Sequence, residues 1–137
     1  MTLQPAEREL MSPMVIAAVV GILLAALLYT IAVFAERRAG ILRPSHLALF
    51  WAGFVVDTTA TTLMSIIAGG FEADVHGFLG FSAIAVMAAH SIWATVVMLR
   101  KQEAWLARFH KLSLAVWVLW MITLVTGFAQ ALPKMMG

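Results

Sequence analysis

The chain of 137 residues has no cysteine and few charged side chains. Without cysteine it can form no disulfide, thiolate metal site or cysteine nucleophile, so a metal or cofactor would have to be held by histidine, methionine or carboxylate side chains. Charged residues make up 12% of the chain and hydrophobic residues 63%, whereas about 25% of residues are charged in a soluble domain. This composition indicates a membrane protein.

Four long runs with almost no charge predict four transmembrane helices. About 20 apolar residues cross a hydrocarbon core of roughly 30 Å as a helix, whereas the strands of a β-barrel would show short alternating segments. Because polar side chains in such helices must be buried against one another, we expect an all-α membrane protein, a four-transmembrane-helix bundle forming a single domain over residues 1–137. The runs, each of 21 or 22 residues, are 14–34, 47–68, 78–99 and 112–132.

The basic residues predict how the bundle is oriented. Seven of the nine lysines and arginines lie between the first and second runs or between the third and fourth: Arg37, Arg38, Arg43, Arg100, Lys101, Arg108 and Lys111. By the positive-inside rule these two loops are cytoplasmic, so both the N-terminus and the C-terminus are expected outside. We therefore expect a multi-pass membrane protein with these two loops on the cytoplasmic side. The net charge of +2 is explained by membrane lipid as a partner and does not indicate nucleic acid.

The segment FVVDTTATTLM, residues 54–64, places a carboxylate in the second apolar run. A charge at the membrane centre costs on the order of 2.5–3.5 kcal/mol, so Asp57 requires a partner. Asp57 and His90 each lie roughly 15 Å from the cytoplasmic end of their runs at 1.5 Å per residue, so we expect them to meet near the bilayer centre. Thr58 and Thr61 would line this polar site, although threonine hydroxyls in helices also bond to the preceding turn.

Helical phase predicts which residues share a face at 100° per residue. Each predicted face carries a histidine, and small residues in the second and third runs leave room for a neighbouring helix or a flat ligand. The faces are His46, Gly53, Asp57 and Met64 in the second run; His76, Gly80, Ala83, Met87, His90 and Ala94 in the third; and His110, Trp117, Met121 and Phe128 in the fourth.

The spacing of His76 and His90 is typical of a haem-binding helix. Fourteen residues separate them, about 21 Å along one face, which is how membrane b-type cytochromes hold two stacked haems, and neutral imidazole is a good iron ligand. We therefore expect an integral membrane protein that binds haem b through these histidines and transfers electrons. His46 or His110 would be a further ligand, and Met64 would lie opposite His76. Its partner would be a redox protein, a quinone or a larger membrane complex.

The same residues leave a second interpretation open. Asp57, Thr58, Thr61 and His90 could form an intramembrane polar site that handles protons or cations, in this chain alone or as an accessory subunit. Histidines at the loop ends also suit helix capping or contact with lipid headgroups.

A metallohydrolase is a third interpretation, because two groups of loop residues could bind zinc. Neither group has a recognisable metal-ligand spacing, so we do not expect the chain to be an enzyme on its own. The groups are His46, His110, Glu36 and Glu103 on the cytoplasmic side, and His76, Asp74 and Glu72 on the outside.

Five blocks cover nearly the whole chain from about residue 22 to 128: LLYTIAVFAER, HLALFWAGFVVDTTATTLM, IAGGF, HGFLGFSAIAVMAAHSIWA and FHKLSLAVWVLWMITLVTG. Together they resemble the HsmA-like family of small four-helix prokaryotic membrane proteins. The resemblance implies the four-helix fold and a bacterial or archaeal cytoplasmic (inner) membrane, and it supplies no activity. It marks as signature positions Asp57, His46, His76, His90 and His110.

Overall fold

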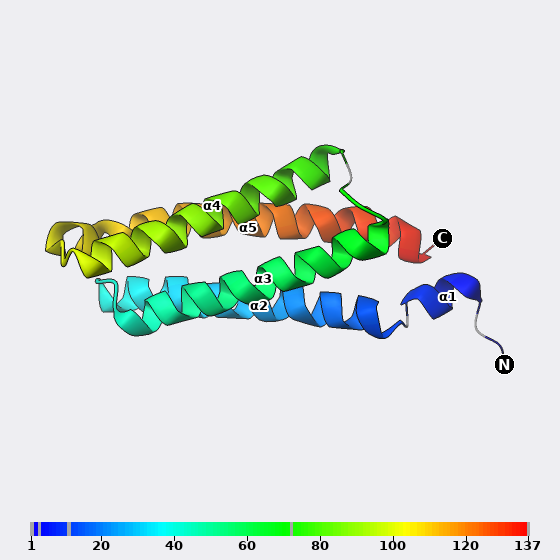
Figure 1. Ribbon diagram of the computed structural model, residues 1–137, viewed down its shortest axis with the longest axis horizontal. Coiled ribbons are helices and arrows are strands. Elements are labelled where there is room, and N and C mark those ends of the chain that lie inside the picture. Colours follow the sequence, from blue (N-terminus) through cyan, green and yellow to red (C-terminus); the bar gives the residue numbers. More distant parts are fainter. Residues whose placement is uncertain (1, 3, 11, 72, 137) are drawn as a thin grey trace.

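A computed structural model of the chain describes residues 2, 4–10, 12–71 and 73–136, and within these ranges it contains helices and turns but no strand (Figure 1). Four of the helices are long and apolar enough to cross a membrane, which confirms the predicted number of spans by length and composition. In chain order the helices are α1 (Pro5–Leu10), α2 (Pro13–Ala39), α3 (Pro44–Ala68), α4 (Val75–Leu99) and α5 (Glu103–Met136).

Local chemistry sets the ends of the long helices. Ser12 caps α2, because its hydroxyl accepts a hydrogen bond from the backbone N–H of Val15 at 3.3 Å, and Asp74 caps α4 by accepting from Gly77 N at 2.8 Å. Helices α2 and α3 end at Gly40 and Gly69, whose φ angles of 71° and 82° lie in the left-handed region that glycine enters without a steric penalty.

The long helices alternate in direction and form two close pairs, α2 with α3 and α4 with α5 (Figure 1). Both chain termini and the α3–α4 turn lie at one end of the bundle, where α4 diverges from α3; we call this the open end. The α2–α3 and α4–α5 turns lie at the other end, which we call the basic end because the seven basic loop residues cluster in or next to these turns.

Small residues bring α2 and α3 close together. A Cβ atom built on Gly53 would lie 2.7 Å from the Tyr29 ring, and one on Gly21 would lie 3.0 Å from Cβ of Ala60. Close backbone approach at small residues is how helices associate in a membrane, where lipid removes the hydrophobic drive for helix pairing. Gly53 therefore leaves the space that the Tyr29 ring fills.

The predicted faces are correct for α3 and α4 and wrong for α5. The buried faces include His46, Gly53 and Asp57 on α3, and Ala83, Met87, His90 and Ala94 on α4. On α5 the predicted face is half-buried or exposed, and the core face is Phe109, Ser113, Val116, Trp120 and Thr123. The error arose because His110 was used to mark the face, whereas the buried side chains Phe109, Val116 and Trp120 each lie one position earlier than a predicted residue.

Gly53→Ala is expected to destabilise the fold by about 1–3 kcal/mol, because the added methyl group overlaps a ring that cannot move away freely. Gly80→Ala is the matched control. A Cβ at Gly80 meets nothing within 4 Å, so that change should stabilise the helix by up to about 1 kcal/mol. Unfolding in mixed micelles measures both, and equal effects of the two variants would contradict the close packing of Tyr29 on Gly53.

Candidate functional site

Helices α2 and α5 each bury two polar residues that lie seven positions apart, Tyr29 and Glu36 on α2, and Ser113 and Trp120 on α5. All four side chains are 4% exposed or less. Seven residues make two helical turns, about 10.5 Å. The interior of the bundle therefore contains two polar layers, an outer one nearer the open end and an inner one nearer the basic end.

Asp57 is the centre of the outer polar layer. Its Oδ2 accepts hydrogen bonds from Tyr29 Oη at 3.1 Å and from Trp120 Nε1 at 2.9 Å. Its Oδ1 accepts only a long bond of 3.4 Å from Thr61 Oγ1, while the Tyr29 and Trp120 rings pack edge to face with centroids 5.1 Å apart. Donors from α2, α3 and α5 thus converge on one carboxyl group that is 1% exposed, and every one of these donors is uncharged.

Three side chains of the inner polar layer form a hydrogen-bonded chain, which we call the inner relay: Glu36, Ser113 and His90. Ser113 Oγ donates to Glu36 Oε2 at 2.7 Å and lies 3.2 Å from His90 Nε2. Because the hydroxyl hydrogen is directed at Glu36, the hydroxyl oxygen accepts from an Nε2–H of His90. Glu36 Oε1 and His90 Nδ1 are buried without a partner.

Asp57 and His90 belong to different layers, so the expectation that they meet is wrong. Asp57 bonds to Tyr29, Trp120 and Thr61, whereas His90 bonds to Ser113. The depth estimate missed Glu36 as the carboxylate of the inner layer. Glu36 is in the last turn of α2, and side chains of a helix tilt toward its N-terminus, which directs this one into the bundle, where it is fully buried.

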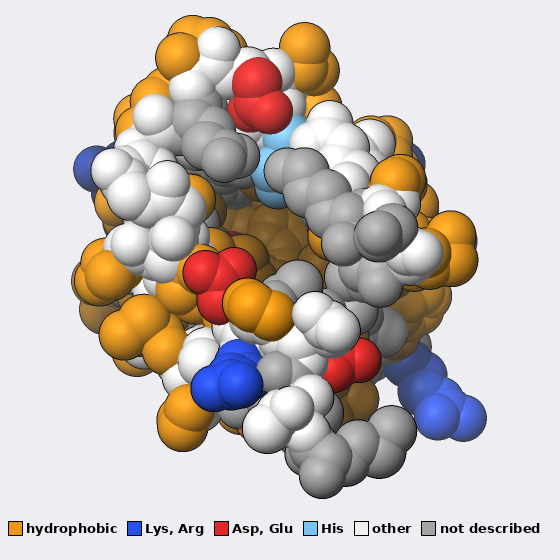
Figure 2. All heavy atoms as spheres, turned by 90° about the vertical axis from the view of Figure 1, so that its right-hand side faces the viewer, with side chains coloured by type: hydrophobic (Ala, Val, Ile, Leu, Met, Phe, Trp, Pro, Cys, Tyr) orange, Lys and Arg blue, Asp and Glu red, His pale blue; other side chains and the backbone are white. Residues whose placement is uncertain are grey.

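A cavity of about 410 Å³ lies between α2, α3, α4 and α5 on the side of the outer polar layer. Among the residues that line the cavity on α3 and α5, Asp57 and Trp120 lie farthest from the open end. The view onto the open end shows a central hollow with hydrophobic side chains in its depth and a histidine and carboxylates around it (Figure 2). Asp57 therefore forms part of the floor of a cavity directed toward the open end.

Met64 and His76 line the same cavity, one heptad farther out than Asp57 and Ala83. The His76 ring packs on Gly127, where an added Cβ would lie 2.7 Å from His76 Cε1. Nδ1 of His76 is buried without a partner. The structure thus brings together the thioether and one of the imidazoles that the sequence identified as ligand candidates.

The other three predicted haem ligands do not line the cavity with Met64 and His76. The His90 ring packs between Phe50 and Phe109, with centroid distances of 4.9 Å and 4.8 Å. His46 Nδ1 accepts a hydrogen bond from the Arg43 backbone at 3.1 Å, which is a capping role. His110 is half-buried near the start of α5. None of these three lines the cavity.

Of the threonines near Asp57, only Thr61 contacts its carboxylate. Thr58 is half-buried with an unpaired hydroxyl, so its predicted place in the polar site is not realised by any hydrogen bond to Asp57. Thr59 and Thr62 are exposed and donate to the backbone oxygens of Val55 and Thr58, respectively. These two hydroxyls therefore bond to the preceding helical turn, which was the other role predicted for threonine, and they face outward.

The zinc-binding interpretation gains no support from the described part of the chain, where no three histidine, aspartate or glutamate side chains form a group that could hold a metal ion. Glu36 is buried in the bundle instead of lying in a cytoplasmic loop group, and Asp74 caps α4. Glu72, the remaining carboxylate of the external group, lies outside the described residues.

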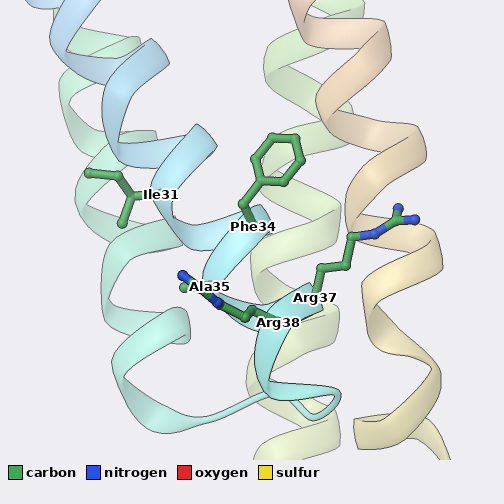
Figure 3. Close-up of a pocket in the computed structure, with 5 residues that line it drawn as sticks. All are labelled: Ile31, Phe34, Ala35, Arg37 and Arg38. Carbon is green, nitrogen blue, oxygen red and sulfur yellow. The ribbon is translucent and has the colours of Figure 1, made fainter.

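A second hollow lies on the surface of α2 near the basic end (Figure 3). Its volume is about 560 Å³, and its lining comes from one helix, with Arg37 extending toward α5. The mixture of apolar and guanidinium groups suits a lipid chain and an anionic headgroup at a membrane surface. The lining residues are Ile31, Phe34, Ala35, Arg37 and Arg38.

No protein-family model matches the chain, and no curated protein or solved structure matches it significantly. The resemblance to the HsmA-like family therefore stays a prediction. The two buried carboxylates and the cavity are the features from which a function can be inferred.

Sequence reasoning missed Tyr29, Ser113 and Trp120 as site residues and placed Glu36 in the wrong environment. The sequence pattern that could have identified them is a spacing of seven residues between Tyr29 and Glu36 and again between Ser113 and Trp120. In a bundle of long helices this spacing returns polar side chains to the same interface after two turns.

Ser113→Ala is expected to destabilise the protein by about 1–3 kcal/mol, because it leaves two further buried polar atoms, Glu36 Oε2 and His90 Nε2, without a partner. Ser82→Ala on the exposed face of α4 is the control and should change stability by less than about 0.5 kcal/mol. Denaturation in mixed micelles compares them, and a Ser113 variant as stable as the Ser82 variant would mean that the inner relay contributes nothing to folding.

Proposed function

We propose that this chain is a multi-pass protein of a bacterial or archaeal cytoplasmic membrane that takes up and releases protons at a buried carboxyl group. The open end, with both termini, faces outside, and the basic end faces the cytoplasm. One observation carries the proposal: Asp57 is 1% exposed, receives hydrogen bonds only from neutral donors and lines a cavity. An ionisable group at membrane depth with access to a cavity is characteristic of proton-handling proteins.

Both protonation states of Asp57 have hydrogen-bond partners. The carboxylate accepts from Tyr29, Trp120 and Thr61. When Oδ1 is protonated, its O–H can donate to the Thr61 hydroxyl, which is able to rotate and accept. Water in the cavity would deliver or remove the proton at Oδ1, because Oδ2 already has two donors.

The inner relay provides a second position for a proton. When His90 is protonated on both ring nitrogens, it can pass its Nε2 proton to Ser113 Oγ while the Ser113 hydroxyl proton passes to Glu36 Oε2, so that one proton moves from the imidazolium to the carboxylate. The 3.2 Å and 2.7 Å distances allow both steps. Ser113 then carries a hydroxyl as before, and the relay can be used again once Glu36 has lost its proton, His90 has gained one and the hydroxyl has turned back toward Glu36.

An apolar layer separates the two proton positions. Val33, Met87 and Val116 are each 8% exposed or less and lie between the two layers on α2, α4 and α5. Such side chains offer no hydrogen-bond partner, so a proton crosses the layer only when water enters or the helices move. Controlled access from one side at a time would follow from this arrangement.

Asp57→Asn is expected to abolish proton uptake into liposomes that contain the purified protein, because an amide cannot take up a proton at neutral pH. Asp74→Asn is the matched control, since it makes the same chemical change at an exposed helix cap. A pH-sensitive dye inside the liposomes reports the flux under an imposed potential. Unchanged flux in the Asp57 variant, or no flux in the wild type, would contradict the proposal.

Haem binding is a second candidate function, because Met64 and His76 line one cavity and methionine with histidine is a known pair of haem ligands. Haem b, when bound there, would supply a one-electron redox centre, with Met64 and His76 as the residues that hold it. The site at His90 does not fit the group, because the ring is enclosed by Phe50 and Phe109 and is hydrogen-bonded to Ser113.

An absorbance spectrum tests this second candidate. Protein expressed with haem supplied should show a Soret band that is lost in His76→Ala and kept in His110→Ala, a matched change at a histidine outside the cavity. A wild-type protein without a Soret band, or one that keeps the full band in His76→Ala, would rule out haem at this site.

A further inference from the structure

We infer that the cavity at the open end binds a hydrophobic organic cation whose charge lies beside Asp57 and replaces the proton there. This inference rests on the proposed proton exchange at Asp57 and adds the chemical class of a second ligand for the same carboxylate.

The charges around Asp57 favour a cation. On three of the helices that line the cavity, Tyr29 on α2, Thr61 on α3 and Trp120 on α5 contact the carboxylate and are uncharged. From α4, His76 faces the same cavity one heptad farther out than Ala83. No lysine or arginine lines the cavity among the described residues, so an ionised Asp57 has no opposite charge beside it until a ligand brings one.

The geometry at Asp57 leaves a position for that charge. Oδ2 is occupied by Tyr29 and Trp120, with contacts of 3.1 Å and 2.9 Å, while Oδ1 has only the 3.4 Å contact with Thr61. A carboxylate oxygen can accept two hydrogen bonds or one bond and one close cation. The free side of Oδ1 is therefore where a cationic group would lie.

The walls of the cavity suit a hydrophobic body better than a hydrated metal ion. Aromatic side chains from two helices and a turn line it, Phe71, Phe81, Trp120 and Phe128, and aromatic faces attract organic cations. The volume of about 410 Å³ is within the range of about 300–1,000 Å³ for small-molecule pockets. A divalent metal would need several oxygen ligands, whereas Asp57 is the only carboxylate among the described lining residues.

Binding of such a cation is linked to release of a proton. Because an ionised Asp57 has no opposite charge beside it, we expect the unliganded carboxyl to carry a proton; the cation stabilises the carboxylate, and the proton passes from Oδ1 to water. Binding should therefore strengthen as the pH rises and release up to one proton per ligand. The same linkage means that a proton gradient would bias the occupancy of the cavity.

Benzyltrimethylammonium is a suitable probe, because its charge is permanent and any released proton must come from the protein. Titration calorimetry on the full chain in detergent, in two buffers with different ionisation enthalpies, gives both the affinity and the number of protons released. We expect wild-type protein to bind the probe with proton release, and phenylmethanesulfonate, an anion of similar size, not to bind. Asp57→Asn should weaken binding by about tenfold or more and remove the proton release.

A second pair of variants tests the cavity without changing the carboxylate. Gly80→Leu adds a side chain that enters the cavity, since a Cβ there meets nothing within 4 Å. Ala85→Leu makes a similar addition on the exposed face of the same helix. Gly80→Leu should weaken probe binding by about tenfold or more, because the leucine side chain occupies space that the buried probe needs. Ala85→Leu should leave probe binding unchanged.

Two results with the wild type would overturn the inference: no binding of the probe, or equal binding of the sulfonate. Equal binding to the Gly80 and Ala85 variants would also overturn it. Each of these outcomes is independent of the proposed function, which is judged by proton flux without the probe. A wild type that shows flux lost in Asp57→Asn but binds no cation would leave the proposed function standing and refute only the second ligand.

Discussion

The hydrogen bonds that Asp57 accepts from Tyr29 and Trp120 are the interaction on which the arrangement of the bundle depends. They connect α3 to α2 and to α5 at 3.1 Å and 2.9 Å. Because Asp57 is 1% exposed, water does not readily replace these partners at Oδ2, so breaking the two bonds costs more than breaking similar bonds on a soluble surface. Three helices are therefore fixed in rotation and in register by one side chain.

The register set at Asp57 continues along the bundle in steps of seven residues. Toward the open end, the next step is Met64 on α3 and Gly127 on α5, where the cavity lies. Toward the basic end, the next step is Phe50 on α3 and Ser113 on α5, where the inner relay lies. One side of Asp57 thus opens into the cavity, and the other side is closed by an apolar layer. This asymmetry is what turns a structural hydrogen-bond network into a candidate proton site with access from one direction.

Hydropathy and helical phase were sufficient for the four long helices and for the interior faces of α3 and α4, because lipid requires long apolar runs and burial follows the 3.6-residue period. They did not predict which polar side chains on different helices would be hydrogen-bonded to one another. Asp57 and His90 were placed together by their estimated depths, but counting residues from the ends of a run does not fix how neighbouring helices are aligned along the bundle, and the two residues lie in different layers. Tyrosine and tryptophan commonly anchor membrane proteins at the interface, so their presence in the sequence did not indicate a polar site. The hydrogen bonds of Tyr29 and Trp120 to Asp57 became apparent only once α2, α3 and α5 were placed together.

The central claim is that the carboxyl group of Asp57 changes its protonation state within the folded protein. Infrared difference spectroscopy of the protein in lipid measures this directly, through the C=O stretching band that a protonated carboxyl has and a carboxylate lacks. We predict a band that disappears as the pH is raised and is missing from the spectrum of Asp57→Asn at every pH. Identical pH-difference spectra for the wild type and for Asp57→Asn would contradict the account.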